Sequence, residues 1–399
     1  MRRDDMRRLA FLVPSALQAI VVLVSIPATV AASSYAEWGQ IAVAQGVGGF
    51  AGTVVALGWG VTGPARVAVG TEVSRATLMS DSFFTKLTVF PFSFVASVAI
   101  AFYLVEGLAP SIVITAVLST LTMGLAPTWY FIGADMPRQM ILVESAPRAI
   151  IGLVGWVLVG LGGVTPLLGL SLQSMGVLFG FILAYLRYGR RQSRLPTLAE
   201  NFLAIRAQGD GVVTQVGYSL FAVLPLYLLA AIKAPGVADF ALIDRLQRQA
   251  STALAPLGNL LVARLASLPM NEVGGRSFVR HRIKEVAVLA VVAGLSASGA
   301  GVLLSSVLTG GQASPSWVLL AAMGGVVGLS LTSTTLPPLA LAPLGRSGAA
   351  KDSALLTIVV GIPAVILGGL FGGPVGSEMA LIFGLAAGVA WQIRYCLKE

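Results

Sequence analysis

Long apolar segments without charged residues occupy most of this 399-residue chain. Each is close to the roughly 20 residues that an α-helix needs to cross the hydrocarbon layer of a membrane. Hydrophobic residues make up 56% of the sequence and charged residues only 11%, whereas about a quarter of a soluble domain is charged. Backbone polar groups inside a bilayer must bond to one another, which a helix achieves within one segment. The sequence therefore predicts an all-α integral membrane protein.

Hydropathy and the positions of charged residues predict about twelve transmembrane helices. Arg148 and Arg187 enclose 38 uncharged residues, which we interpret as two short crossings with the turn in GLGGVTP. The start of the chain resembles a secretion signal, but its apolar run is longer than usual, so we expect an uncleaved first helix. The expected spans are residues 9–31, 39–61, 84–104, 111–132, 148–163, 166–187, 211–232, 237–262, 286–308, 316–338, 354–372 and 377–394.

The net charge of +9 follows the sides of the expected membrane. Of the 26 lysines and arginines, 23 fall in the tails and odd-numbered connections, a count that includes Lys86 and Arg148. Cytoplasmic loops carry such an excess of basic residues. The pattern predicts a multi-pass protein of the bacterial cytoplasmic (inner) membrane with both termini in the cytoplasm. Nucleic acid is not an expected partner, because the basic residues do not form a patch on a soluble face.

Redox chemistry and metal binding have little support in the sequence. Cys396 is the only cysteine, so no intrachain disulfide is expected. His281 is the only histidine and lies in a basic loop, where a solvated side chain is the simpler interpretation. We expect no cofactor and no metal site.

One expected span, residues 237–262, carries Asp244, Arg245 and Arg248 near its middle. A helix lying on the membrane surface would keep these charges in water, but every later loop would then invert its charge bias. Each charge costs roughly 2.5 to 3.5 kcal/mol at mid-membrane. The helix therefore has either a buried ion-pair network between helices or a solvated wall for an anionic substrate, and both interpretations stay open.

Polar residues share one face of this helix when it is projected at 100° per residue. A milder polar stripe on the first helix includes Gln18 and Ser25, where ordinary hydrogen bonds between helices are an equal explanation. The residues expected to line a substrate cavity are Arg245, Arg248, Asp244, Gln247, Gln249, Thr252, Asn259, Gln18 and Ser25.

The chain divides into two similar halves. The longest basic connection separates the sixth and seventh spans, so we predict a six-helix bundle at residues 1–187, a cytoplasmic linker at 188–210 and a second bundle at 211–399. AEWGQIAVAQ and GPARVA in the first half are echoed by ADFALIDRLQ and LVARLA in the second. Arg66 and Arg264 then occupy matching cytoplasmic ends, where we expect a gate. Parallel repeats of this kind surround a central cavity.

Several segments resemble a known family. The segment from Ala126 to Ile150, APTWYFIGADMPRQMILVESAPRAI, is similar to the Trp-aromatic-aromatic-x-Gly-x-acid element of polysaccharide (O-antigen-type) flippases. SSYAEWGQIAVAQGVGGFAGTVVALGWGVTGPARVA and LIDRLQRQASTALAPLGNLLVARLA resemble the beginning and the eighth helix of that family. The chain departs from the pattern by its short length, by Pro137, and by Ile132 where the family has glutamine.

The resemblance implies the fold of the multidrug/oligosaccharidyl-lipid/polysaccharide exporter superfamily. Its polysaccharide flippases move undecaprenyl-diphosphate-linked oligosaccharide from the cytoplasmic to the outer leaflet for cell-surface polysaccharide synthesis. The expected partners are this lipid-linked glycan and membrane lipids, and a glycosyltransferase or polymerase partner stays open. The chain would not be an enzyme.

Two alternatives compete with this interpretation. A multidrug or toxin efflux antiporter of the same fold would call for buried carboxylates in the first half. We expect none there, because Glu37 and Glu106 lie at outer ends and Asp81 and Asp135 at inner ends. A polyprenyl-dependent membrane glycosyltransferase or polymerase would need a catalytic acid or a domain outside the membrane, yet each expected outer loop has about seven residues or fewer.

Overall fold

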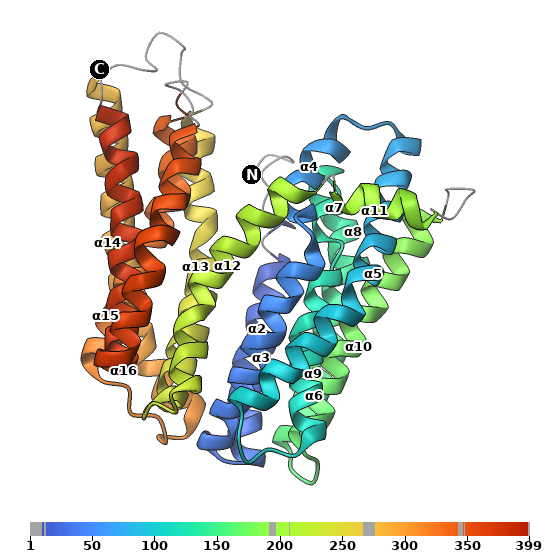
Figure 1. Cartoon of the computed structure of the whole chain (residues 1–399), viewed down its shortest axis with the longest axis vertical. Helices are drawn as coiled ribbons and strands as arrows, with labels where there is room; N and C mark the ends of the chain where they lie inside the picture. The colour runs from blue at the N-terminus through green and yellow to red at the C-terminus, as the bar shows by residue number, and fades with distance from the viewer. Residues whose placement is uncertain are drawn as a thin grey trace. The chain divides into compact units, whose positions relative to one another are not determined.

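The computed structural model describes residues 10–11, 13–190, 197–206, 208–265, 276–341, 346 and 348–397 (Figure 1). Every regular element within these ranges is helical, which confirms the all-α prediction. Nine of the described helices are long and apolar enough to cross a membrane. The last of them, α16 (Gly348–Leu397), contains a non-helical residue at Gly373 where two helices meet. With α12 (Gly209–Ala231) and α13 (Val237–Leu265), the described part of the chain accounts for the expected twelve crossings. The chain is a multi-pass membrane protein.

The contacts group the chain into two compact units, Met1–Val223 and Leu224–Glu399, so that the boundary falls within α12. The linker expected at residues 188–210 contains a further helix, α11 (Leu198–Arg206). Asn201 of α11 donates a hydrogen bond of 2.6 Å to the hydroxyl of Thr88 in the same unit. This contact holds α11 against the bundle.

The first unit is a bundle of helices, several of which are interrupted. Its remaining elements are α2 (Val13–Ala32), α3 (Tyr35–Ala56), α4 (Trp59–Val69), α5 (Glu72–Leu104), α6 (Pro110–Leu121), the 3₁₀ turn η1 (Thr122–Leu125), α7 (Thr128–Gly133), α8 (Pro137–Met140), the π turn η2 (Ile141–Ser145), α9 (Ala146–Gly160), α10 (Pro166–Ala184) and the π turn η3 (Tyr185–Gly189). The fourth span is broken between η1 and α7, at Ala126 and Pro127. Because proline has no backbone N–H, the helix cannot continue its hydrogen bonds through this point.

Small residues let the helices of this unit approach closely. A Cβ atom added to Gly124 would overlap the backbone oxygen of Gly52, and one added to Gly48 would overlap the backbone oxygen of Val117. Helices inside lipid gain little from the hydrophobic effect, so they depend on such tight van der Waals packing. The glycines at the interface of α3 with α6 and η1 are therefore required by the distance between the backbones.

The second unit contains α13, α14 (Arg276–Thr309), α15 (Trp317–Leu336), the π turn η5 (Pro337–Leu341) and α16. Packing is again close between glycines, because a Cβ atom on Gly324 of α15 would overlap the backbone oxygen of Gly294 of α14. The end of α12 belongs to this unit and brings Tyr227 into it.

Three spans begin earlier than the hydropathy pattern predicts. α5 begins at Glu72, the fifth span at Pro137 and α14 at Arg276, rather than at residues 84, 148 and 286. The placement of Lys86 and Arg148 in cytoplasmic connections is therefore wrong, because the structure buries them at 1% and 9% exposure. The prediction counted these two residues with the cytoplasmic connections because they are charged, whereas both have polar partners inside the bundle.

Candidate functional site

The charged residues in the middle of α13 form a bidentate ion pair. Arg248 Nε lies 2.9 Å from Asp244 Oδ2, and Arg248 Nη2 lies 2.8 Å from Asp244 Oδ1. The two residues are one helical turn apart, which places both side chains on the same face. A spacing of four residues by itself predicts such a pair, and the structure contains it. The Arg248 side chain is 42% exposed and the Asp244 side chain 13%, so Asp244 is the more buried partner and orients the more exposed guanidinium.

A second acid lies near this pair. Glu378 of α16 is only 1% exposed, and neither of its carboxylate oxygens has a hydrogen-bond donor among the described residues. The charges of Asp244 and Arg248 both act on Glu378, and they also act on Tyr227 of α12. Residues from three helices of the second unit therefore lie within electrostatic range of Arg248. Glu378 is not among the site residues predicted from the sequence, although it is a lone glutamate in the apolar segment GPVGSEMALIFG.

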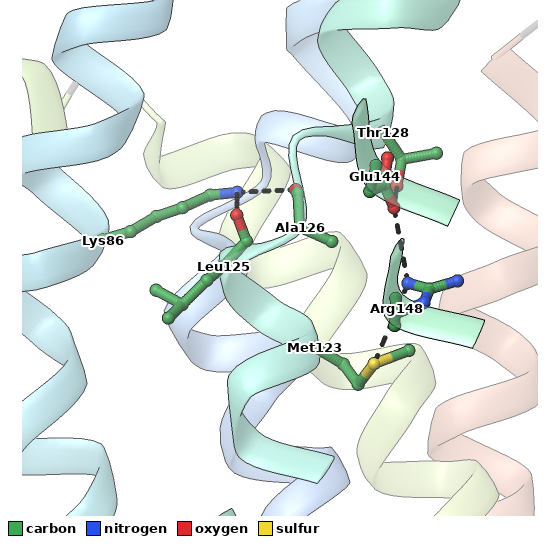
Figure 2. A network of polar contacts seen from close by, with 7 residues as sticks. All are labelled: Lys86, Met123, Leu125, Ala126, Thr128, Glu144 and Arg148. Carbon is green, nitrogen blue, oxygen red and sulfur yellow. Dashed lines mark hydrogen bonds and ion pairs between the residues drawn. The ribbon is translucent and has the colours of Figure 1, made fainter. Parts of the chain in front are cut away.

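Lys86 stabilises the break in the fourth span. Its Nζ donates hydrogen bonds to the backbone oxygens of Leu125, at 3.3 Å, and of Ala126, at 3.1 Å (Figure 2). The last carbonyls of a helix have no partners within the helix, and a cation is favourable at this negative end of the helix dipole. The buried lysine therefore donates to backbone carbonyls that the interruption at Pro127 leaves without helical hydrogen-bond donors.

A buried carboxylate lies on the other side of the same break. Glu144 is 3% exposed, and its Oε1 accepts hydrogen bonds from Thr128 Oγ1, at 2.7 Å, and from Arg148 Nη1, at 3.3 Å (Figure 2). Glu144 lies in the π turn η2, a type of helix irregularity that is frequent at functional sites. The expectation that helix interiors of the first half lack a carboxylate is therefore wrong. Glu144 precedes Arg148 by four residues in a mostly apolar stretch, and this spacing was the available signal.

No family model matches the chain, and no curated protein has a matching sequence. Lipid II flippase MurJ in its inward closed conformation matches with a TM-score of 0.63 at 12% identity, over 98% of this chain and 87% of that chain. An inward-facing multidrug resistance MATE family transporter of the MOP superfamily matches with a TM-score of 0.57 at 12% identity, over 96% and 93%. The chain has the fold of MOP superfamily transporters. The eukaryotic MATE transporter AtDTX14 also matches, with a TM-score of 0.55 at 16% identity over 98% and 94%.

The aromatic element that resembles the flippase family packs two helices of this MOP fold together. The three aromatic residues of this element are buried, namely Trp129, Tyr130 and Phe131. The centre of the Trp129 ring lies 4.9 Å from the centre of the Trp59 ring in α4. A Cβ atom on Gly133 would clash with the backbone of α4 at Pro64. Within the first unit, the element therefore fixes α7 against α4.

The structure places the other predicted site residues with varying detail. Thr252 is exposed and donates to the backbone oxygen of Arg248 at 2.8 Å. Ser25 is buried and donates to the backbone oxygen of Val22 at 2.7 Å, so its hydroxyl is occupied within its own helix. The half-buried residues are Arg245, Gln247, Gln249 and Gln18. The side chains of Asn259 and Arg264 lie outside the described part of the structure.

The predicted gate residue Arg66 lies at the exposed end of α4. Its guanidinium carbon is 5.5 Å from the centre of the Trp59 ring, which is a cation–π distance. Arg66 is therefore positioned by the same aromatic cluster that joins α4 to α7. The role of Arg66 and Arg264 as a gate stays a prediction.

Proposed function

We propose that the chain is a flippase or exporter for an anionic lipid-linked substrate, namely an undecaprenyl-diphosphate-linked oligosaccharide. The observation that carries the proposal is the exposed guanidinium of Arg248 in the middle of a membrane-length helix, held by the more buried Asp244. A charge at mid-membrane is costly unless it has a partner or meets water. Arg248 has a partner in Asp244, and its side chain is exposed enough for an anion to approach its N–H groups.

Guanidinium groups suit a diphosphate. They stay charged at any physiological pH and bond phosphate oxygens through two parallel N–H groups. Arg245 and Arg248 would bind the diphosphate, Asp244 would orient Arg248, and Gln247, Gln249, Thr252 and Asn259 would contact sugar hydroxyls. Gln18 and Ser25 are the expected sugar contacts from the first unit, although the Ser25 hydroxyl would first have to leave the backbone oxygen of Val22.

The membrane potential favours export of such a substrate. A negative interior drives each net negative charge outward by about 2.3 kcal/mol per 100 mV. We place the protein in a bacterial inner membrane with both termini in the cytoplasm, as its basic loops indicate. Glycosyltransferases or polymerases are proposed neighbours of the cytoplasmic loops, and the protein itself is proposed to do no covalent chemistry.

Proteoliposomes test the role of the two arginines. A fluorescent polyprenyl-diphosphate oligosaccharide is loaded in the bilayer, and its appearance in the opposite leaflet is followed with a membrane-impermeant quencher. Each hydrogen bond to a charged group contributes about 1.5 to 3 kcal/mol, so the double variant Arg245→Ala, Arg248→Ala should lose about a hundredfold or more in transport. The control Arg280→Ala changes an exposed arginine at the start of α14. Transport by the double variant at the rate of this control would refute the proposal.

A second candidate function is export of cationic drugs, and the buried Glu144 favours it. Sequence reasoning set this alternative aside because it found no buried carboxylate in the first half, and that argument no longer holds. In the same proteoliposomes, a drug exporter would expel a fluorescent lipophilic cation and leave the lipid-linked sugar in its original leaflet. Glu144→Gln would then abolish dye export, whereas the double arginine variant would keep it.

A further inference from the structure

The carboxylate of Glu144 is only half satisfied. Its Oε1 accepts both of the hydrogen bonds that the structure gives the group, from Thr128 and from Arg148. Its Oε2 is buried and has no hydrogen-bond donor among the described residues, and the buried Nε–H of Arg148 has no acceptor among them. A side chain that served only to join α7 to α9 would gain from using both oxygens, because an unpaired oxygen of a buried carboxylate is costly.

The charged groups around Glu144 are unbalanced. Arg148 of α9 and Lys86 of α5 both act on its charge, so one carboxylate faces two buried cations. α2 and α10 pack against η2 and contain no ionisable side chain. α8 packs against η2 as well and contributes only Arg138, which is exposed. The protonation state of Glu144 therefore decides whether the buried cluster of Lys86, Glu144 and Arg148 has a net charge of one or two positive charges.

The hydrogen bonds of Lys86 make it a fixed member of the cluster. Its ammonium group donates to the carbonyls of Leu125 and Ala126 and therefore stays at the break in the fourth span. Arg148 is held more weakly, because the partners of its Nη1 among the described residues are the Glu144 carboxylate and Met123 Sδ, the latter at 3.9 Å. A change in the charge of Glu144 would therefore move Arg148 before it moved Lys86.

We propose that Glu144 is a proton-binding site. Oε2, which has no hydrogen-bond donor among the described residues, takes a proton from a hydronium ion: an O–H bond forms on Oε2, the hydronium O–H bond breaks, and water and a neutral acid remain. The neutral acid no longer pairs with Arg148, which is left with the weak sulfur contact and becomes free to turn toward another anion. Release of the proton restores the pair. The site lies within the first unit, so the proposal holds whichever molecule the protein carries.

Infrared difference spectroscopy of the purified full-length protein tests this site. A protonated buried carboxyl gives a C=O stretch separate from that of carboxylates, and glutamate labelled with ¹³C at its side-chain carboxyl identifies the residue type by a shift of that band. We expect a band that appears as pH falls and that Glu144→Gln removes. Glu378→Gln deletes the other buried glutamate and should leave the Glu144 band in place. Glu37→Gln, at the exposed start of α3, should likewise leave the Glu144 band in place.

A second variant keeps the test decisive if Glu144→Gln fails to fold. Thr128→Val removes one hydrogen bond from Oε1 but keeps the carboxyl group, so the band should persist at a shifted frequency and with a shifted titration midpoint. The proposal is overturned if no labelled band titrates in the wild-type protein, or if the band is the same in Glu144→Gln or in Thr128→Val as in the wild type. Displacement of the band by sodium ions at constant pH would also overturn it, because the site would then bind a metal cation.

Discussion

Replacement of Lys86 by methionine tests the explanation of the broken fourth span. Methionine fills a similar volume but cannot donate to the carbonyls of Leu125 and Ala126, which the wild-type side chain satisfies at 3.3 and 3.1 Å. A buried polar group without a partner costs about 1 to 3 kcal/mol, so two such carbonyls cost about 2 to 6 kcal/mol. Removing the buried ammonium recovers part of this loss, because burial of a charge is itself unfavourable. We expect a net destabilisation of about 2 to 4 kcal/mol.

The unfolding free energy can be measured by titrating the detergent-solubilised protein with a denaturing detergent and following tryptophan fluorescence. Arg148 still balances the charge of Glu144 in the variant, so the measured loss reports mainly on the two carbonyls. Lys284→Met is the matched control, because Lys284 is exposed in α14 and surface substitutions usually change stability by less than about 0.5 kcal/mol. A Lys86→Met protein as stable as this control would show that the carbonyls do not depend on the lysine.

Three further predictions follow from single contacts. Asp244→Asn removes the charge that orients Arg248 and should lower transport about tenfold, equivalent to about 1.4 kcal/mol, in the leaflet assay without changing membrane insertion; unchanged transport would contradict the orienting role. Gly124→Leu should destabilise the protein by more than about 3 kcal/mol, because its side chain would enter the space of the Gly52 backbone, and a folded variant of wild-type stability in the detergent titration would be inconsistent with the close packing. Asn201→Ala should cost about 1 kcal/mol and speed proteolysis of the linker containing α11, whereas equal cleavage rates would argue against that contact.

The fold was largely predictable because the bilayer restricts the choice of structure. Apolar segments of helical length lead to an all-α membrane protein, and the regular placement of basic residues helps to separate one crossing from the next. The exact starts of the spans were not predictable in the same way. Its charge assigned Lys86 to the cytoplasmic edge of the third span, and only the three-dimensional structure reveals that the broken backbone at Leu125 and Ala126 gives it partners inside the bundle.

The candidate site was predictable where its residues share one helix. The spacing of Asp244 and Arg248 was sufficient to predict their ion pair, since residues four apart lie on one helical face. Glu378 lies near the pair but belongs to a helix more than a hundred residues later in the chain. No local sequence pattern predicts that these residues lie close together. Glu144 was predictable in part. Its spacing from Arg148 indicates a pair, but its burial beside Thr128 depends on the break in the fourth span.

A direct comparison of two substrates in wild-type proteoliposomes tests the central claim that Arg248 serves an anionic lipid-linked substrate. Vesicles containing the protein and an imposed potential, negative on the cytoplasmic side, are given either the fluorescent polyprenyl-diphosphate oligosaccharide or a lipophilic cationic dye. We predict that the diphosphate-linked sugar changes leaflet faster than in protein-free vesicles and that collapsing the potential slows it. Export of the dye with no movement of the lipid-linked sugar would contradict the account.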